Sequence, residues 1–244
     1  MKISVLTPSF NSGKYIERAI ESVLLQNYDD FEHIITDGGS TDDTISIVEK
    51  YPHIKFVSEA DKGQSDAMNK AFKMSSGEII VYLNADDEFL PGVFNTVNGE
   101  FSSNASADMV VGNLLFKTDE ETLTRIPSNK YSHIFQYWLN VFPNNPVSYF
   151  YKRKVQESIG DFPIDDHFAM DLWFLLKAYR KFNIHKVESI FGIFHSDGTN
   201  KTATIETGYY LHNTVKNHLK KDNPFLLPYF YLKLFLGKLK QSKI

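Results

Sequence analysis

Acidic side chains recur where the apolar, β-rich runs of the first hundred residues end. Such runs cover residues 33–36, 54–57 and 78–83, and the acids that follow them are Asp37, Glu59, Asp61, Asp86 and Asp87. If the runs are parallel strands, their carboxyl ends meet at one edge of the sheet, where ligands bind. Crowded carboxylates raise each other's pKa unless a cation or hydrogen-bond donors lie among them. Because Mg²⁺ commonly bridges one or two carboxylates to a phosphate group, the pattern predicts a metal–diphosphate site.

Motifs for other chemistries are absent from the sequence. The first predicted strand–helix turn, residues 7–13, reads TPSFNSG, which lacks the glycine fingerprint of dinucleotide-binding folds. The chain has no G-x-x-x-x-G-K-[ST] motif, which excludes a P-loop, and no G-x-S-x-G motif of acyl hydrolases. Cysteine is absent too, so disulfides, thiolate metal sites and a cysteine nucleophile are excluded.

Charge is distributed unevenly along the 244 residues. The whole chain carries 26 basic and 30 acidic side chains, a net charge of −4, which argues against nucleic acid as a partner. Residues 215–244 hold seven lysines and one acid, a charge of +6 that leaves −10 for residues 1–214. An acidic body with a basic, aromatic tail suggests two different partners.

Two hydrophobic periods alternate in the first hundred residues. We expect strands at residues 3–7, 33–36, 54–57 and 78–83, and helices at 15–24, after 40, at 67–72 and after 91. This alternation predicts a parallel sheet with helices on both faces. Farther along, we expect a hairpin or edge strands at 108–116 and 122–126, an irregular segment at 127–146, a strand at 147–151, a helix at 172–182 and one or two strands within 185–194.

Four motifs in this order resemble those of the GT-A family 2 glycosyltransferases. They are TPSFN at 7–11, DGGSTD at 37–42, EADKG at 59–63 with DAMNK at 66–70, and LNADD at 83–87. The resemblance implies a Rossmann-like mixed, mostly parallel α/β sheet with helices on both faces, here with a C-terminal helical tail. It implies a GT-A domain over 1–214, with a nucleotide-binding half (1–104) and an acceptor-binding half (105–214), followed by the tail at 215–244. The implied activity is an inverting sugar transfer from a nucleotide diphosphate donor, usually UDP, helped by Mn²⁺ or Mg²⁺.

The same resemblance assigns roles to individual residues. The residues implied in donor binding are Pro8, Ser9, Asn11, Asp37, Asp61, Asp66 and Asp86, and those implied in metal binding are Asp86, Asp87 and His195. Asp37 would accept a hydrogen bond from the base N3–H, which uracil has and cytosine lacks. Asn84 is a departure, because the family often places an aspartate there.

Structural roles compete with each of these assignments. Asp37 could only form a turn, Asp66 could cap a helix, and Asp86 with Asp87 could precede a helix start at Pro91. We favour the functional role for Asp37 and for the Asp86–Asp87 pair, because three predicted strand ends agree. For Asp66 and His195 the two readings remain balanced.

Transfer to a hydroxyl requires a general base, and a partly buried carboxylate suits this task. The family has an acid pair followed by a large apolar residue and tryptophan; here Met170-Asp171-Leu172-Trp173 matches at Asp171. We therefore assign the base to Asp171 and expect Trp173 to offer a floor for a sugar ring. The alternative is that Asp171 caps a helix. The polar segment 195–201 resembles a loop that closes over the donor, and Lys201 could balance the leaving-group charge.

The tail contains an apolar, aromatic stretch at residues 224–239 with lysines set among it. We interpret it as a helix lying in a lipid interface, and the acceptor as a saccharide or a lipid-linked saccharide. The alternative is packing on the body or on a second copy, as in a homodimer. The opening apolar run is too short for a signal peptide and no run could span a bilayer, so we expect a cytoplasmic protein, peripheral on the inner face of the membrane if the tail binds lipid.

We therefore predict a hexosyl- or N-acetylhexosaminyl-transferase in polysaccharide or glycan synthesis. A sugar-nucleotide nucleotidyltransferase is one alternative, although it would need a glycine-rich basic loop after the first strand. A non-catalytic nucleotide- or sugar-binding module is another, and it would have no need of Asp171.

Overall fold

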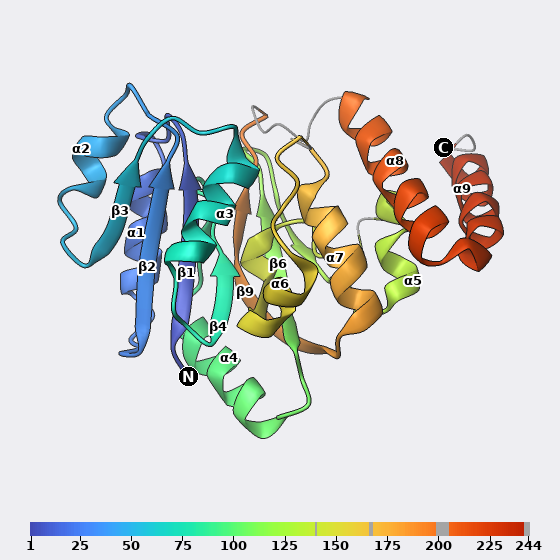
Figure 1. Cartoon of the computed structure of the whole chain (residues 1–244), viewed down its shortest axis with the longest axis horizontal. Coiled ribbons are helices and arrows are strands. Elements are labelled where there is room, and N and C mark those ends of the chain that lie inside the picture. Colours follow the sequence, from blue (N-terminus) through green and yellow to red (C-terminus); the bar gives the residue numbers. More distant parts are fainter. Residues whose placement is uncertain (140, 166–167, 199–204, 242–244) are drawn as a thin grey trace.

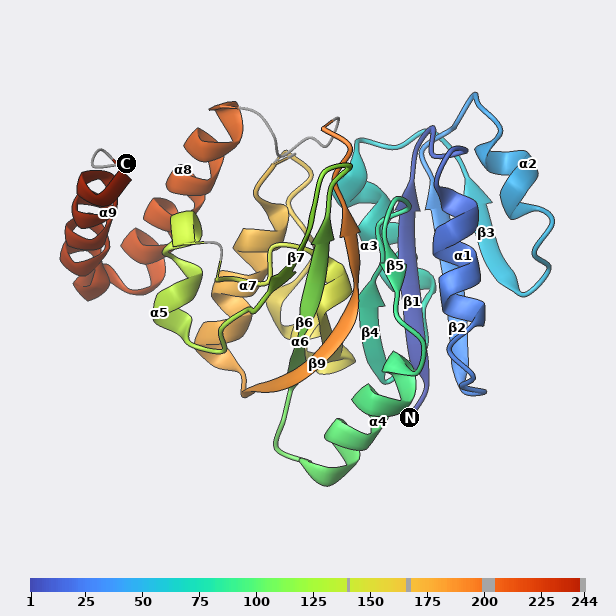
Figure 2. The same cartoon turned by 180° about the vertical axis from the view of Figure 1, so that it is seen from behind.

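The computed structural model describes residues 1–139, 141–165, 168–198 and 205–241. A β-sheet runs through the middle of the molecule, helices cover both of its faces, and α8 and α9 close one end (Figure 1, Figure 2). The strands are β1 (Ile3–Ser9), β2 (Phe31–Asp37), β3 (Ile54–Ser58), β4 (Ile79–Tyr82), β5 (Glu88–Phe89), β6 (Met109–Lys117), β7 (Thr122–Arg125), β8 (Tyr149–Lys152) and β9 (Ile184–His195). The α-helices are α1 (Ile16–Leu24), α2 (Thr44–Val48), α3 (Gln64–Met74), α4 (Val93–Ser103), α5 (Tyr131–Ile134), α6 (Arg153–Ile159), α7 (Met170–Lys181), α8 (Ile205–Asp222) and α9 (Leu227–Gln241).

The sheet has the order β3-β2-β1-β4-β8-β6-β9-β5, with β7 paired to β6. Its first four strands are all parallel, and β8 joins β4 and β6 in antiparallel pairing, whereas β6 and β9 are parallel. This confirms the predicted mixed α/β sheet. The predicted hairpin is the antiparallel pair β6–β7. Chain order reverses on the two sides of β1, so a crevice is expected beyond the carboxyl ends of β1 and β4.

The alternating side chains of β1 bury both faces of the sheet. Leu6 packs in the cluster that holds α3 and α7, whereas Ile3 and Val5 pack in the cluster that holds α1 and α4. Both faces are therefore covered, as the nearly continuous apolar strands require.

The first strand is longer than the sequence suggests, because it continues through Pro8 and Ser9. These residues lie opposite Thr36 and Asp37 of β2. On its other side β1 pairs with β4 only as far as Leu6. At Pro8 the β4 side of the strand is thus already unpaired, so the missing proline N–H breaks no ladder bond.

The predicted boundary between body and tail, at residues 214 and 215, falls inside α8. Val215 and Leu219 of α8 and Phe230 of α9 are fully buried in the core cluster that contains α7. Apolar burial thus continues past the boundary, and α8 belongs to the body. Among the described residues, no helix combines the length and apolarity needed to cross a bilayer.

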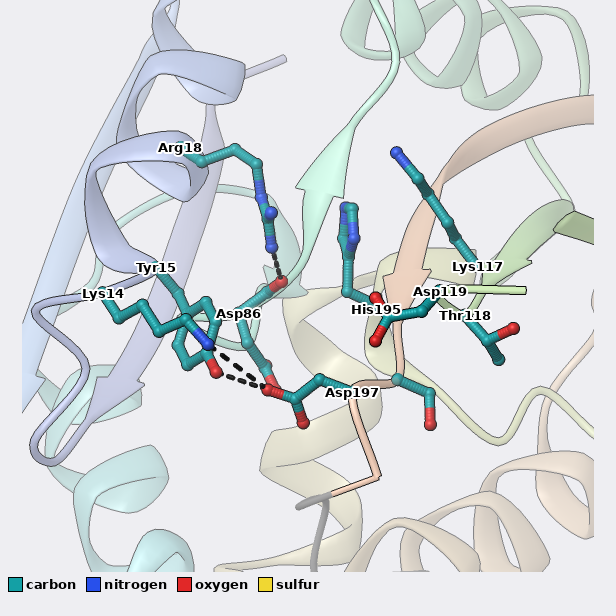
Figure 3. Close-up of a pocket in the computed structure, with 10 residues that line it drawn as sticks. Lys14, Tyr15, Arg18, Asp86, Lys117, Thr118, Asp119, His195 and Asp197 are labelled. Carbon is teal, nitrogen blue, oxygen red and sulfur yellow. Dashed lines mark hydrogen bonds and ion pairs between the residues drawn. The ribbon is translucent and has the colours of Figure 1, made fainter. Parts of the chain in front are cut away.

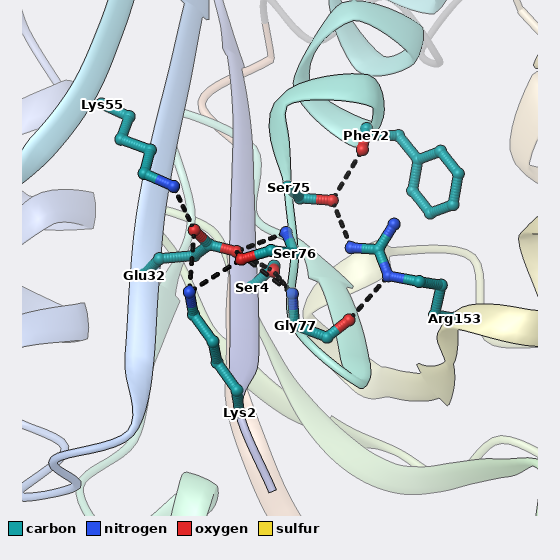
Figure 4. A network of polar contacts seen from close by, with 9 residues as sticks. All are labelled: Lys2, Ser4, Glu32, Lys55, Phe72, Ser75, Ser76, Gly77 and Arg153. Atoms are coloured by element: carbon teal, nitrogen blue, oxygen red, sulfur yellow. Dashed lines mark hydrogen bonds and ion pairs between the residues drawn. The ribbon is translucent and has the colours of Figure 1, made fainter.

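A buried carboxylate ties the amino ends of the strands together (Figure 4). Glu32 of β2 lies 2.5 Å from Lys55 and 3.2 Å from Lys2, and it accepts hydrogen bonds from Ser4 Oγ at 2.7 Å and from the Ser76 N–H at 2.6 Å. Burial by itself would raise the pKa of Glu32, but these lysines and hydrogen bonds outweigh burial and hold the pKa far below its usual value. This end of the sheet is therefore a satisfied charge network.

Candidate active site

The predicted donor-binding residues lie at or beyond the carboxyl ends of the strands, and β2 and β3 end at the upper edge of the molecule in Figure 1. The loop after β1 is fastened to the loop after β2: the Asn11 side-chain oxygen accepts from the Thr41 N–H at 2.9 Å, and the Asn11 N–H donates to Ser40 Oγ at 2.7 Å. Asn11 has a φ of 49°, a left-handed conformation that asparagine tolerates better than most residues. Asn11 thus shapes this rim through its contacts to the second loop.

Asp37, at the end of β2, accepts hydrogen bonds from the turn that follows it. Its Oδ2 accepts from the N–H groups of Gly39 and Ser40 at 3.1 and 2.8 Å and from Ser58 Oγ at 2.7 Å, and its Oδ1 accepts from Ser40 Oγ at 2.5 Å. The side chain is only 2% exposed. The turn role considered from the sequence is therefore present in the structure.

Asp61 lies on the loop between β3 and α3, which crosses the rim toward β4. Its Oδ1 accepts from the Gly63 N–H at 2.7 Å, and its carboxylate lies against Gly38 in the loop after β2. Farther along the same segment, Gln64 Nε2 donates to the Asn84 side-chain oxygen beyond β4 at 3.3 Å. The ends of β2, β3 and β4 are thus connected along one rim.

Asp66 lies in the first turn of α3. It accepts from the Lys62 N–H at 3.1 Å and forms an ion pair with Lys70 at 3.5 Å. An acid that reaches back to an N–H before its helix is a cap. The contacts of Asp66 are therefore those of the capping alternative.

Asp87 is fully buried beyond the end of β4. Its oxygens accept from the side-chain amides of Asn145 at 2.7 Å and Asn84 at 3.0 Å and from the His195 N–H at 3.1 Å. Burial raises the pKa of Asp87 to about 8, with a further increase from Asp86, and the three hydrogen bonds only partly oppose it. Asp87 is thus a buried acid whose partners are neutral groups and another acid.

Asp86 faces a pocket between the start of α1 and the end of β9 (Figure 3). Its carboxylate points toward Asp197. Burial raises the pKa of Asp86 and the Asp197 charge adds to this, whereas Arg18 and His195 lower it. Arg18 donates to the backbone oxygen of Asp86 and so fixes the chain at this point. This pocket is lined by Asp86 but not by Asp37 or Asp61.

The His195 ring, at the end of β9, bonds Glu88 Oε1 through Nε2 at 2.8 Å. In Figure 3 the ring points away from the Asp86 carboxylate. Asp197, two residues on, accepts a hydrogen bond from the Tyr15 hydroxyl. Lys201 lies outside the described residues. Among the residues that the structure describes, no group of three or more histidine, aspartate or glutamate side chains could hold a metal ion unaided. The predicted trio Asp86, Asp87 and His195 therefore forms no such cluster.

Asp171 lies in the first turn of α7, and Ala169 is the N-cap of that helix. The neighbouring Met170 contacts Ser65 of α3 at 2.9 Å, which brings the start of α7 to the rim. Asp171 also raises the pKa of Tyr149, although burial of that phenol is the larger cause. Asp171 is thus half-buried beside the strand ends and is not the cap residue of its helix.

Trp173 is covered on one side by Lys177, whose Nζ lies 3.8 Å from the centre of the indole ring. This cation–π contact occupies one face of the ring that was expected to support a sugar.

Sequence reasoning missed several residues that shape the site. They are Arg18, Glu88, Asn145 and Asp197. Asn145 lies in the stretch PNNP at 143–146, which signals a turn but carries no information about a partner 58 residues away. Phe10, within the TPSFN motif, is 62% exposed directly after β1, so its ring lies open to solvent at this rim.

Comparison with known proteins gives a consistent family assignment. The family model of glycosyl transferase family 2 matches residues 4–198. An uncharacterized glycosyltransferase of Nostoc sp. is 33% identical over 68% of this chain and 54% of its own length. The GalNAc(5)-diNAcBac-PP-undecaprenol beta-1,3-glucosyltransferase of Campylobacter jejuni is 27% identical over 99% of this chain and 84% of its own length. The chain spans about half of the Nostoc protein and 16% of the Escherichia coli chondroitin synthase that it also matches.

Solved structures agree on the fold. S. aureus TarS in complex with UDP has a TM-score of 0.71 at 21% identity, over 90% of this chain and 65% of that chain. The Pyrobaculum calidifontis mannosyltransferase in complex with GDP-Man and Mn²⁺ has a TM-score of 0.62 at 18% identity, over 98% of this chain and 75% of that chain. At these identities the likeness establishes the shared GT-A fold.

Proposed function

Because the chain belongs to glycosyltransferase family 2 and is a glycosyltransferase, we propose that it transfers a hexose or N-acetylhexosamine from a UDP-sugar to a glycan hydroxyl, with inversion. The observation that supports this proposal is a line of contacts along one rim, in which Gln64 bonds Asn84, Asn84 bonds Asp87, and Ser65 bonds Met170 at the start of α7. UDP is the donor nucleotide that we favour, since the TarS structure contains it. Phe10 supports a nucleotide here, because its exposed ring offers a base a stacking face.

Asp86 is the residue that we propose to hold Mn²⁺ or Mg²⁺ together with the donor diphosphate. The residues fit such a cation, because burial and a second carboxylate both raise the pKa of Asp86 and a bound cation would relieve this. When bound, the cation would offset negative charge on the diphosphate as it leaves. Asp87 is buried under three donors, so we assign it to holding the loop that carries Asp86. The His195 backbone ties β9 to that loop.

Asp171 is the base that we propose. It would accept the proton of the acceptor hydroxyl while that oxygen bonds to the anomeric carbon and the bond from this carbon to the diphosphate oxygen breaks. One displacement inverts the anomeric centre, and UDP leaves with the electron pair. The half-buried position of Asp171 supports this role, because desolvation makes a carboxylate a stronger base.

The proposal is tested by donor hydrolysis. The chain is incubated with Mn²⁺ and, one at a time, UDP-glucose, UDP-galactose, their N-acetylamino counterparts and GDP-mannose, and nucleotide release is measured. We expect slow release of UDP from one UDP-sugar. Pyrophosphate release from UTP and a sugar phosphate would favour a nucleotidyltransferase instead. Binding of UDP without turnover, even with saccharide acceptors present, would favour a binding module.

As part of this proposal, the acceptor is lipid-linked and the exposed face of α9 contacts the membrane surface. Its outer face and the turn before it expose large apolar side chains: Phe225 at 91%, Phe235 at 61% and Leu232 at 55%. The positive charge of residues 215–244 complements anionic lipid headgroups. Phe230, on the opposite side of α9, is buried against the body, so one face of α9 is docked while the other is free to enter an interface.

Vesicle sedimentation tests the membrane contact. We expect the chain to sediment with vesicles containing phosphatidylglycerol and much less with phosphatidylcholine alone. A double variant, Phe225→Ser with Phe235→Ser, should lose several-fold of this binding, whereas Leu25→Ser, at an exposed apolar residue directly after α1, should not. Equal binding by all three proteins would contradict the proposal. Self-association that only the double variant abolishes would instead identify a homodimer face.

A further inference from the structure

The carboxylate expected to recognise the nucleobase, Asp37, is buried within its own turn. Three donors from Gly39, Ser40 and Ser58 bond its Oδ2 and the Ser40 hydroxyl bonds its Oδ1. Asp37 is only 2% exposed, so no oxygen of its carboxylate is open to a ligand. A base N3–H could bond Asp37 only if the turn after β2 opened. Recognition of the base must therefore fall to another acceptor at this corner.

Asp61 lies beside that turn, in a space that only a glycine leaves open. A Cβ on Gly38 would come within 2.8 Å of Asp61 Oδ2, 3.1 Å of Cγ and 3.2 Å of Oδ1. The whole carboxylate therefore rests on the Cα of Gly38. Gly38 is itself held against β1, because its N–H donates to the Ser9 oxygen at 2.9 Å. A residue on the β3–α3 loop is in this way brought against the end of β2, next to the end of β1.

The two oxygens of Asp61 have different surroundings. Oδ1 accepts from the Gly63 N–H at 2.7 Å, which fixes the orientation of the carboxylate, and Oδ2 is the atom nearest Gly38. Unlike Asp37, Asp61 is only half-buried, so a ligand can reach it. Asp61 is thus oriented from one side by the protein and accessible from another.

We propose that Asp61, placed by Gly38, is the carboxylate that selects a base carrying N3–H, such as uracil, over cytosine. This inference rests on the proposed UDP-sugar donor. A carboxylate can only accept a hydrogen bond, so it pairs with the N3–H of uracil and repels the N3 lone pair of cytosine. An asparagine whose Oδ1 still accepts from the Gly63 N–H presents Nδ2 to the base, so it donates to the N3 lone pair of cytosine and loses the bond to the N3–H of uracil.

Calorimetric titration of the full chain with UDP and with CDP, each with Mn²⁺, tests the proposal. We expect wild type to prefer UDP by roughly tenfold or more, the effect of one charge-assisted hydrogen bond. Asp61→Asn should abolish most of this preference and fold normally, because asparagine still accepts from the Gly63 N–H. Gly38→Ala should also lower the preference, because its methyl group displaces the carboxylate. Asp43→Asn removes an exposed acid from the loop after β2 that makes no capping hydrogen bond, and it should keep the wild-type ratio.

The Asp37→Asn variant distinguishes the role of Asp37 from that of Asp61. We expect it to lower the melting temperature, because it disrupts the turn, and to keep the UDP-to-CDP ratio. A preserved ratio in Asp61→Asn, or a ratio lost in Asp37→Asn alone, would overturn the role of Asp61. Failure of wild type to bind UDP, with or without binding of GDP, would overturn the proposed donor itself, a different result from either of these.

Discussion

The two ends of the parallel strands treat a buried carboxylate in opposite ways. At the amino end, Glu32 has two lysines within 3.2 Å as well as hydrogen bonds, and its pKa is held far below the usual value (Figure 4). At the carboxyl end, Asp87 has only neutral donors and lies beside Asp86, and burial raises its pKa to about 8. The charge of Glu32 is thus compensated by cationic side chains of the protein, and Asp87 has no such partner among the described residues.

The two carboxylates therefore differ in what they contribute: Glu32 contributes to the stability of the fold, and the acids near Asp87 are suited to ligand binding. A compensated buried carboxylate stabilises the fold, because removing it strands its cationic partners. Uncompensated acids cost stability, and they persist where a ligand supplies the missing positive charge. The carboxyl end of the sheet is therefore the end suited to a cation and a diphosphate.

The largest effect is expected at the base. Asp171→Asn should lower turnover by ~100-fold or more, since a positioned base contributes this much, and should leave UDP binding nearly intact. Turnover and UDP affinity are measured in parallel, with Asp165→Asn as a nearby control. Unchanged turnover would show that Asp171 is not the base and would weaken the assignment of catalysis to the carboxyl ends of the strands.

The next effect is expected at Asp87. Asp87→Asn should lower turnover by ~10–100-fold, because the loop that carries Asp86 loses a support. The free energy of unfolding should change by less than about 1 kcal/mol, since a carboxyl with a pKa of about 8 is already mostly neutral at pH 7, as asparagine is. Urea unfolding and UDP release measure the two quantities. A loss of stability as large as that of a Glu32 variant would erase the contrast between the two ends.

Glu32→Gln should lower stability and leave turnover nearly unchanged, the opposite of Asp87→Asn. We expect it to cost about 2 kcal/mol of unfolding free energy, less than a fully buried ion pair because Lys2 and Lys55 are partly exposed. Turnover of the folded variant should stay within about twofold of wild type, because Glu32 lies at the opposite end of the strands. Lys55→Gln, which removes a half-exposed side chain and leaves Lys2 beside Glu32, should cost less. A large loss of turnover in Glu32→Gln would show that the two ends are not independent.

The smallest effect concerns acid stability. His33 is fully buried in β2, and burial lowers its pKa to about 3 from a model-peptide value of 6.5. The unfolded chain therefore binds a proton that the folded chain resists, and stability present above pH 6.5 is lost as the pH falls toward 3. Between pH 6.5 and 5.5 we expect a loss of about 1 kcal/mol. His33→Gln should flatten this part of the curve of unfolding free energy against pH; an unchanged slope would assign the loss to other groups. Glu32, whose pKa is lowered, contributes to the loss of stability only at lower pH.

The sequence predicts the parallel half of the fold well, because its signals are local. Strands β1 to β4 and helices α1 and α3 follow from apolar periodicity within short windows. The short strand β5 and the helix α6 were not predicted, since Glu88–Phe89 pairs only with distant β9 and Arg153–Ile159 lacks a clear apolar stripe. The start of α8 was missed as well, because residues 205–214 were assigned to the body without an element.

The candidate site was predicted in outline rather than in detail. That acids follow the strand ends is expected from strand direction alone, and contacts do link the segment after β3 to Asn84 and Asp87. The roles of Asp61, Asp86 and Asp87 in a shared site stay a prediction. The state of each acid depends on long-range contacts that spacing does not reveal. Asn145 reaches Asp87, and Gly38 makes room for Asp61. Three of the four donors around Asp37 come from Gly39 and Ser40, which are close to it in sequence, so the turn is a local signal, whereas the bond from Ser58 is not.

The most direct test of the functional end is UDP binding with and without a cation. Titrations of wild type and Asp86→Ala with UDP are compared in the presence of Mn²⁺ and in the presence of a chelator. We expect Mn²⁺ to strengthen UDP binding to wild type by tenfold or more and to have little effect on Asp86→Ala, with both proteins equally stable to urea. Equal strengthening in the two proteins, or UDP affinity that ignores Mn²⁺ in wild type, would contradict the assignment of the cation and diphosphate to Asp86.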